Sequence, residues 1–115
     1  MRYICLIYTN EADYNQMTEA QQQANMGAYW AFTEAVNKAG VNKGGDALMP
    51  TSMATTVRVR SGKTVTTDGP FAETKEQLGG FYLLECANLD EAIEWAAKIP
   101  GAAVGSIEVR PVMEF

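Results

Sequence analysis

The sequence predicts an α+β protein of the ferredoxin-like, split βαβ class, an antiparallel sheet with two helices on one face. Three observations indicate this class. The expected elements follow the order strand, helix, strand hairpin, strand, helix, strand. The chain has 115 residues, so we expect a single domain spanning residues 1–115. The two most hydrophobic strands are apolar on both faces, as in strands covered on both sides.

Apolar residues on both faces also predict a partner, because two helices cover only one face of a sheet. Burying a Leu or Phe side chain is worth about 1.5–3 kcal/mol, and several left exposed on one face would favour association. We therefore expect a two-fold homodimer through the helix-free sheet face, which together forms a dimeric α/β-barrel.

Strand character follows from β-branched and aromatic residues bounded by turn signals. Ser61-Gly62 is a plausible two-residue hairpin turn. Val41–Thr51 contains two adjacent glycines and a proline, and indicates an irregular or short edge segment. The expected strands are Arg2–Tyr8, Thr55–Arg60, Lys63–Thr67, Gly79–Cys86 and Gly105–Met113.

Two helices follow from capping residues and apolar stripes. Thr18 with Gln21 fits a capping box, and Gly40 supplies a left-handed stop for the first helix. Asn88 caps the second helix, which ends at Pro100. We expect a polar loop at residues 9–13 and a single helical turn at residues 72–78. The expected apolar stripes are Ala28, Tyr29, Phe32, Ala35, Val36 and Ala39, then Leu89, Ala92, Ile93, Ala96 and Ile99.

Composition narrows the function. The net charge of −5 provides no broad basic face, so we expect no nucleic-acid partner. No apolar stretch approaches a membrane span, so we expect no membrane association. Cys5 and Cys86 lie in apolar strands, which indicates reduced, buried thiols and a cytoplasmic protein. The chain has no histidine, and therefore lacks the usual metal ligand and neutral-pH general base.

The run Asp68–Glu76 (DGPFAETKE), followed by Gly79–Phe81, resembles the signature of the DGPF-type branch of the YCII-related family. The segments Asn88–Ala96 and Gly105–Pro111 resemble that family's closing pattern. The resemblance implies a dimeric α+β barrel and little defined chemistry, because the family is mostly uncharacterised. Other branches resemble small enzymes with a histidine–aspartate pair, whose histidine would fall near Met26 here. This chain has no histidine, so that pair does not carry over.

Two aspartates are candidate catalytic residues. Asp68 is the first choice as a cleft carboxylate whose pKa is raised by partial burial so that it acts as a general base. Turn statistics favour the alternative that Asp68 caps the following turn. Asp46 is the second choice, because it follows two glycines that let the backbone approach a ligand or another strand closely.

Four residues are candidates for substrate binding: Arg58 and Lys75 to hold an anionic group, Phe71 to line a pocket, and Tyr8 to donate a hydrogen bond. Each has a structural alternative: an edge-strand charge for Arg58, a solvated charge run for Lys75, and core packing for the two aromatics. No residue pattern indicates a metal or another cofactor.

Two functional hypotheses remain open at the level of sequence. The first is a small-molecule enzyme with a cleft between the helix-free sheet face, the DGPF turn and the partner subunit. The second is a non-catalytic ligand-sensing or regulatory module. The resemblance links the second to alternative sigma factors.

Overall fold

A four-stranded antiparallel sheet forms the centre of the computed structural model, which describes all residues 1–115. The strands lie in the order β2-β5-β1-β6, so β5 and β1 are the two central strands. This order confirms the ferredoxin-like α+β class. The strands are β1 (Arg2–Thr9), β2 (Asn42–Ala47), β5 (Gln77–Glu85) and β6 (Ser106–Pro111).

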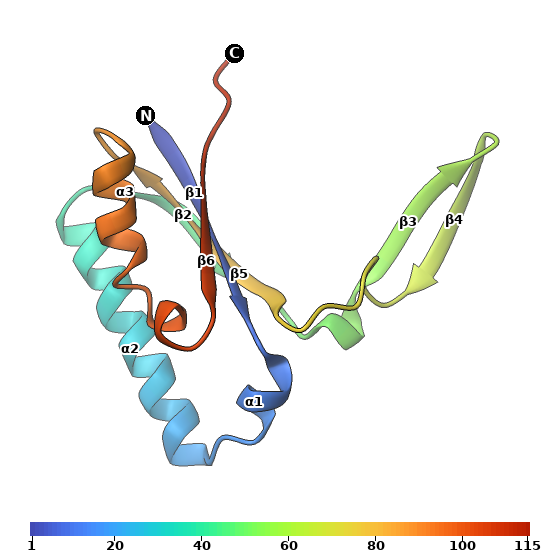
Figure 1. The fold of residues 1–115 in the computed structure, drawn as a ribbon, viewed down its shortest axis with the longest axis horizontal. Helices are drawn as coiled ribbons and strands as arrows, with labels where there is room; N and C mark the ends of the chain where they lie inside the picture. Colours follow the sequence, from blue (N-terminus) through green and yellow to red (C-terminus); the bar gives the residue numbers. More distant parts are fainter.

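Helices α2 (Glu19–Lys38) and α3 (Leu89–Ala96) lie together on one face of this sheet (Figure 1). The capping box at the start of α2 is confirmed: Gln21 N–H donates to Thr18 Oγ1 (3.1 Å), and Thr18 N–H donates to Gln21 Oε1 (2.9 Å). The Asn88 side chain accepts from the Glu91 N–H, as expected for α3. Gly40 follows α2 with φ 75°, the left-handed conformation expected there.

Three local expectations are wrong. The second helix was expected to end at Pro100, but α3 ends at Ala96, and Pro100 begins a separate 3₁₀ turn. The expected polar loop contains the short helix α1 (Glu11–Asn15), because the Asn10 side chain accepts from the Ala12 N–H and caps a helical turn. The expected helical turn at residues 72–78 is absent. The chain there runs without helix until β5 begins at Gln77, since strand pairing with β1 reaches to that residue. Two short 3₁₀ helices complete the fold: η1 (Thr51–Met53) and η2 (Pro100–Ala103).

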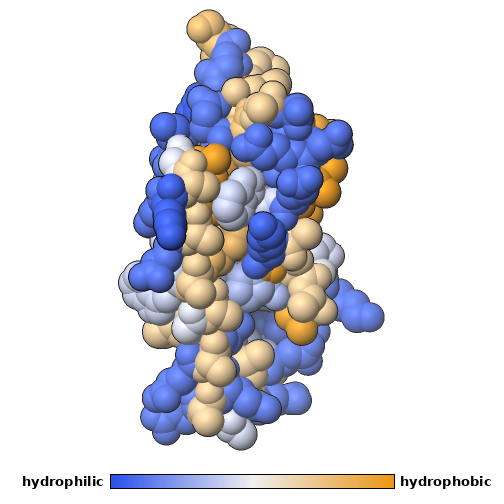
Figure 2. Space-filling view, turned by 90° about the vertical axis from the view of Figure 1, so that its left-hand side faces the viewer, coloured by the Kyte–Doolittle hydropathy of each residue, from blue (hydrophilic) through white to orange (hydrophobic).

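The core lies between the sheet and the helix layer. Phe32 from α2 packs edge-on against Tyr82 of β5, with ring centroids 4.9 Å apart. The buried helix stripes are narrower than expected, since Leu89 and Ile93 are about half exposed. Figure 2 looks onto the helix side, where hydrophilic side chains are spread among weakly hydrophobic ones. The buried core residues are Tyr3, Cys5, Ile7, Phe32, Val36, Leu84, Cys86, Ala92, Ala96 and Ile99.

The opposite face of the sheet has no helix. Register pairs Ile4 with Leu83 and Leu6 with Phe81 across β1 and β5, and these side chains alternate with the buried ones. The expectation that both faces of the central strands are apolar is therefore confirmed. None of the helices combines the length and the hydrophobicity needed to cross a lipid bilayer.

The hairpin of β3 (Thr55–Arg60) and β4 (Lys63–Asp68) is a separate two-stranded sheet. It stands away from the body on the side opposite the helices (Figure 1). Its turn matches expectation, with positive φ at both Ser61 (52°) and Gly62 (74°). Its place differs from expectation, because the strand that follows α2 in the main sheet is β2 and not the hairpin. β2 lies at the edge of the sheet, so the short edge segment that was one of the two alternatives for Val41–Thr51 is confirmed.

Candidate functional site

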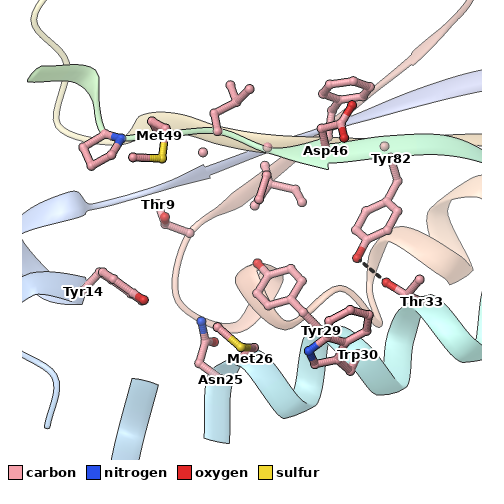
Figure 3. Close-up of a pocket in the computed structure, with 18 of the residues that line it drawn as sticks. Thr9, Tyr14, Asn25, Met26, Tyr29, Trp30, Thr33, Asp46, Met49 and Tyr82 are labelled. Carbon is pink, nitrogen blue, oxygen red and sulfur yellow. Dashed lines mark hydrogen bonds between the residues drawn. The ribbon is translucent and has the colours of Figure 1, made fainter. Parts of the chain in front are cut away.

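A cavity of about 770 Å³ opens between α2 and the adjoining parts of β1, β2 and β5 (Figure 3). Its volume lies within the range of small-molecule pockets, roughly 300–1,000 Å³. The cavity lies on the helix side of the sheet, whereas the expected cleft was on the helix-free side. The main lining side chains are Ile7, Thr9, Glu11, Tyr14, Asn25, Met26, Tyr29, Trp30, Thr33, Ala47, Met49 and Tyr82.

Small residues make room on the sheet wall. Gly45 pairs with Tyr82, whose side chain faces the helices, so Gly45 and Ala47 share that face. A Cβ on Gly45 would lie 2.5 Å from the Phe81 carbonyl oxygen, and its φ of 152° disfavours other residues. The glycine pair before Asp46 thus permits close approach of another strand, one of the two alternatives left open by the sequence.

The helix wall supplies aromatic and amide groups. Asn25, Met26, Tyr29 and Trp30 rise from α2 toward the sheet, and Tyr82 descends from it (Figure 3). Tyr82 Oη and Thr33 Oγ1 form a hydrogen bond of 2.8 Å, which fixes one end of the cavity. The Asn25 amide makes no hydrogen bond within the chain, so its donors and acceptor are free for a ligand.

Tyr29 is oriented by the backbone. The Gly101 N–H donates to Tyr29 Oη at 3.1 Å, and a Cβ on Gly101 would lie only 2.8 Å from that oxygen. Burial raises the pKa of the Tyr29 hydroxyl, and this hydrogen bond offsets the shift in part. Tyr29 is therefore a neutral phenol near pH 7, able to donate its own proton to a ligand.

Glu11 has the one charged side chain that lines the cavity, and this side chain is hydrogen-bonded to Thr51. Both carboxylate oxygens of Glu11 accept hydrogen bonds from Thr51, one from its N–H (2.9 Å) and one from its hydroxyl (2.8 Å). Asp46 lines the cavity through its backbone, while its carboxylate lies on the opposite side of the sheet from Tyr82 (Figure 3). No lysine or arginine is among the lining residues.

The structure does not bring the six sequence-predicted site residues together. Asp46 alone borders the cavity. Arg58 and Asp68 lie on the projecting hairpin, and Lys75 and Phe71 lie in the loop that follows it, where the Phe71 side chain is 80% exposed. Tyr8 lies on the helix-free face, and its hydroxyl donates to Glu108 Oε1 at 3.4 Å.

The alternatives for these residues also differ from the structure in part. The Asp68 carboxylate accepts no hydrogen bond. The turn is held instead by the Gly69 N–H, which donates to the Ala54 carbonyl (2.7 Å), and by the Thr56 hydroxyl, which donates to the Gly69 carbonyl (2.8 Å). Phe71 is not a core plug, because most of its surface is exposed. Lys75 forms no ion pair, in agreement with a solvated charge run.

The residues that sequence reasoning missed are those on α2. Asn25 and Tyr29 are four positions apart and therefore share one helix face. The signal in the sequence was the Asn25 amide, which lies on the same helix face as the apolar stripe. A polar side chain on a face that is otherwise apolar indicates a cavity or a binding site.

Other chemistry is limited. No three Cys, Asp or Glu side chains gather as a metal-ligand set. Cys5 is fully buried, and burial, with a smaller effect of Cys86, raises its pKa to about 11. At neutral pH Cys5 is therefore a thiol and not a nucleophilic thiolate.

Fold and cavity together define a class: ferredoxin-like α+β proteins with a small-molecule-sized cavity between the helix layer and the sheet. The family model of the YCII-related domain matches residues 1–115. An uncharacterised protein of Rhizobium meliloti (strain 1021) is 40% identical over 114 residues, which cover 97% of this chain and 92% of that relative. The chain belongs to the YCII-related family, as the resemblance implied.

Proposed function

We propose that this chain is a small-molecule binding protein that takes an uncharged, largely apolar or aromatic ligand into the cavity beside α2. The observation that carries the proposal is the cavity itself, with aromatic, methionine and amide groups on its helix wall and small residues on its sheet wall. Sites of this kind combine apolar area with a few polar groups that orient the ligand. The binding unit is the single domain of residues 1–115.

The charge of the lining selects the ligand class. An anionic ligand would meet no lysine or arginine in the cavity. A cationic ligand would meet a single carboxylate, Glu11, and two hydrogen bonds from Thr51 already take up part of the acceptor capacity of its oxygens. A neutral ligand needs no oppositely charged side chain in the lining. It can form hydrogen bonds with the Asn25 amide and the Tyr29 hydroxyl.

The same lining favours binding over acid–base catalysis. Met26, where the resemblance places the histidine of other branches, borders the cavity. The candidate acid–base and anion-binding groups lie elsewhere, on the hairpin, its following loop and the far side of the sheet. A general base must lie within hydrogen-bond reach of the proton that it removes, and no free carboxylate does so here.

Filling the cavity tests the proposal. Ala47 is exposed and faces the cavity from β2, so Ala47→Phe places a ring in the ligand's space without displacing core atoms. Wild-type protein is screened by thermal shift against a library of uncharged aromatic metabolites. A hit at a hundredfold its dissociation constant adds about 2.7 kcal/mol, a rise in melting temperature of about 11 °C for this length. We expect Ala47→Phe to abolish that rise.

Ala24→Phe is the matched control, because Ala24 is an exposed α2 residue outside the cavity lining. The control should keep the full ligand-dependent shift. A hit that both variants retain would place the ligand elsewhere and contradict the proposal. Turnover of the hit by the wild-type protein would favour the enzyme hypothesis instead.

Three further attributes are part of the proposal. A homodimer through the helix-free face is supported by the uncovered apolar side chains of β1 and β5. Membership of the DGPF branch is supported by the Asp68–Glu76 run. A cytoplasmic location is supported by the two free, buried thiols of Cys5 and Cys86.

A further inference from the structure

The β3–β4 hairpin lacks a partner within its own chain. Its two strands make substantial contact only with each other. A single two-stranded hairpin in water is marginally stable at best. The fold therefore leaves this element to be stabilised by something outside the chain.

The two faces of the hairpin differ in chemistry. Register places Val57 opposite Thr66 and Val59 opposite Thr64, which gives one largely β-branched face whose single charged residue is Asp68, opposite Thr55 at the base of the hairpin. Both valines are 61% exposed. The other face carries Arg58, Arg60 and Lys63, with Val65 between them. An antiparallel sheet that packs on one side and is solvated on the other has this pattern.

The size of the exposed surface points to a second copy as the partner. The chain exposes 8076 Å², whereas a compact monomer of 12.5 kDa exposes about 6,200 Å². The radius of gyration is 16.0 Å, against about 13 Å for a compact domain of this length. The excess of about 1,900 Å² falls within the area that one subunit buries in an obligate homodimer, roughly 1,000–2,500 Å².

Continuity with the helix-free face supports the same partner. The hairpin stands on that side of the sheet, so a second sheet packed against the first would lie beside it (Figure 1). In a two-fold dimer each hairpin then reaches the other subunit. We propose that β3–β4 is an arm that packs its Val57/Val59 face against a second copy of this chain and leaves its basic face in solvent. This inference rests on the homodimer proposed above and not on the ligand.

Two double variants separate the faces of the arm. Val57→Glu/Val59→Glu and Arg58→Gln/Arg60→Gln change the net charge by the same −2 and occupy the same stretch of β3. Sedimentation equilibrium measures the dimer dissociation constant of each. We expect the valine variant to weaken the dimer at least tenfold and the arginine variant to stay within about twofold of wild type.

Hydrogen exchange of the wild-type protein provides a second measurement that needs no variant. We expect amides of residues 55–68 to exchange at least tenfold more slowly above the dimer dissociation constant than below it. Two outcomes would contradict the proposed contact between the hairpin and the second copy without contradicting the dimer. One is equal exchange at both concentrations, and the other is a dimer that the valine variant leaves intact. A dimer weakened only by the arginine variant would also contradict that contact. A wild-type monomer would instead show that the proposed dimer itself had failed.

Discussion

Cys5 shows how burial sets the chemistry of a single residue. Its side chain has no exposed surface, at the centre of the layer between β1 and the helices. Burial raises the pKa of its thiol to about 11 from an ordinary value of 9.0. The expectation of a small buried hydrophobe from the apolar run in β1 is thereby confirmed, whereas the direction and cause of the pKa shift need the fold.

The raised pKa predicts a loss of stability at alkaline pH. The unfolded chain releases the Cys5 proton near pH 9 and the folded chain near pH 11. The contribution of this proton to the free energy of unfolding is therefore complete below pH 9, and it declines as the pH rises from 9 to 11. A difference of two units corresponds to about 2–3 kcal/mol. The free energy of unfolding is measured in urea at pH 8.5 and pH 10.5. We expect it to fall less between these pH values for Cys5→Ala than for the wild-type protein. Equal losses in both proteins would contradict this.

Asp46 shows why a site residue is hard to place from sequence. Adjacent residues in a strand point to opposite faces, so one register step moves a carboxylate from cavity to far side. The bulge between Asn42 and Gly44 sets that register in β2. The sequence shows the glycines but not the bulge, and Asp46 consequently faces away from the cavity that its neighbours line.

At the scale of elements, α2 carries the helix wall of the cavity and begins at the Thr18 capping box. Thr18→Ala removes the acceptor for the Gln21 N–H and should cost about 1 kcal/mol, roughly 4 °C in melting temperature. Thr67→Ala is the control, because Thr67 is exposed and its side chain makes no hydrogen bond. Comparable losses in calorimetry for the two variants would show that the cap contributes nothing specific.

The hairpin is an element whose local structure is set by sequence and whose place is not. Ser61 and Gly62 form the expected turn, and the strand pairing that follows from this turn sets Arg58 opposite Val65. Its exclusion from the main sheet follows from a competition that propensity does not describe. The Gly44–Ala47 segment pairs with β5 despite its glycines, and so occupies the edge that the hairpin would otherwise fill.

At the scale of the whole molecule, the chain measures 47 × 45 × 19 Å, and one broad face of its sheet has no helix cover. Leu6 lies on that face opposite Phe81. In the proposed dimer, Leu6→Glu would bury an unpaired carboxylate, which costs several kcal/mol. We expect light scattering to give twice the 12.5 kDa chain mass for wild type and the single-chain mass for Leu6→Glu.

Leu89→Glu is the matched control for the dimer, since Leu89 is a half-exposed leucine at the start of α3 on the helix side. It should remain dimeric, because a carboxylate in the first turn of a helix is favourable and the residue is remote from the helix-free face. A wild-type chain that elutes and scatters as a monomer at micromolar concentration would contradict the dimer.

The sequence by itself determined the fold class, the N-caps of α2 and α3, the glycine stop after α2, the hairpin turn and the apolar character of both faces of β1 and β5. These features depend on local periodicity and on a few residues with strong backbone preferences, and both can be read along the chain. Only the tertiary structure decided that the hairpin projects, that Asp46 faces away and that a cavity opens beside α2. Each of those outcomes depends on register and packing between segments far apart in sequence, which no local pattern encodes.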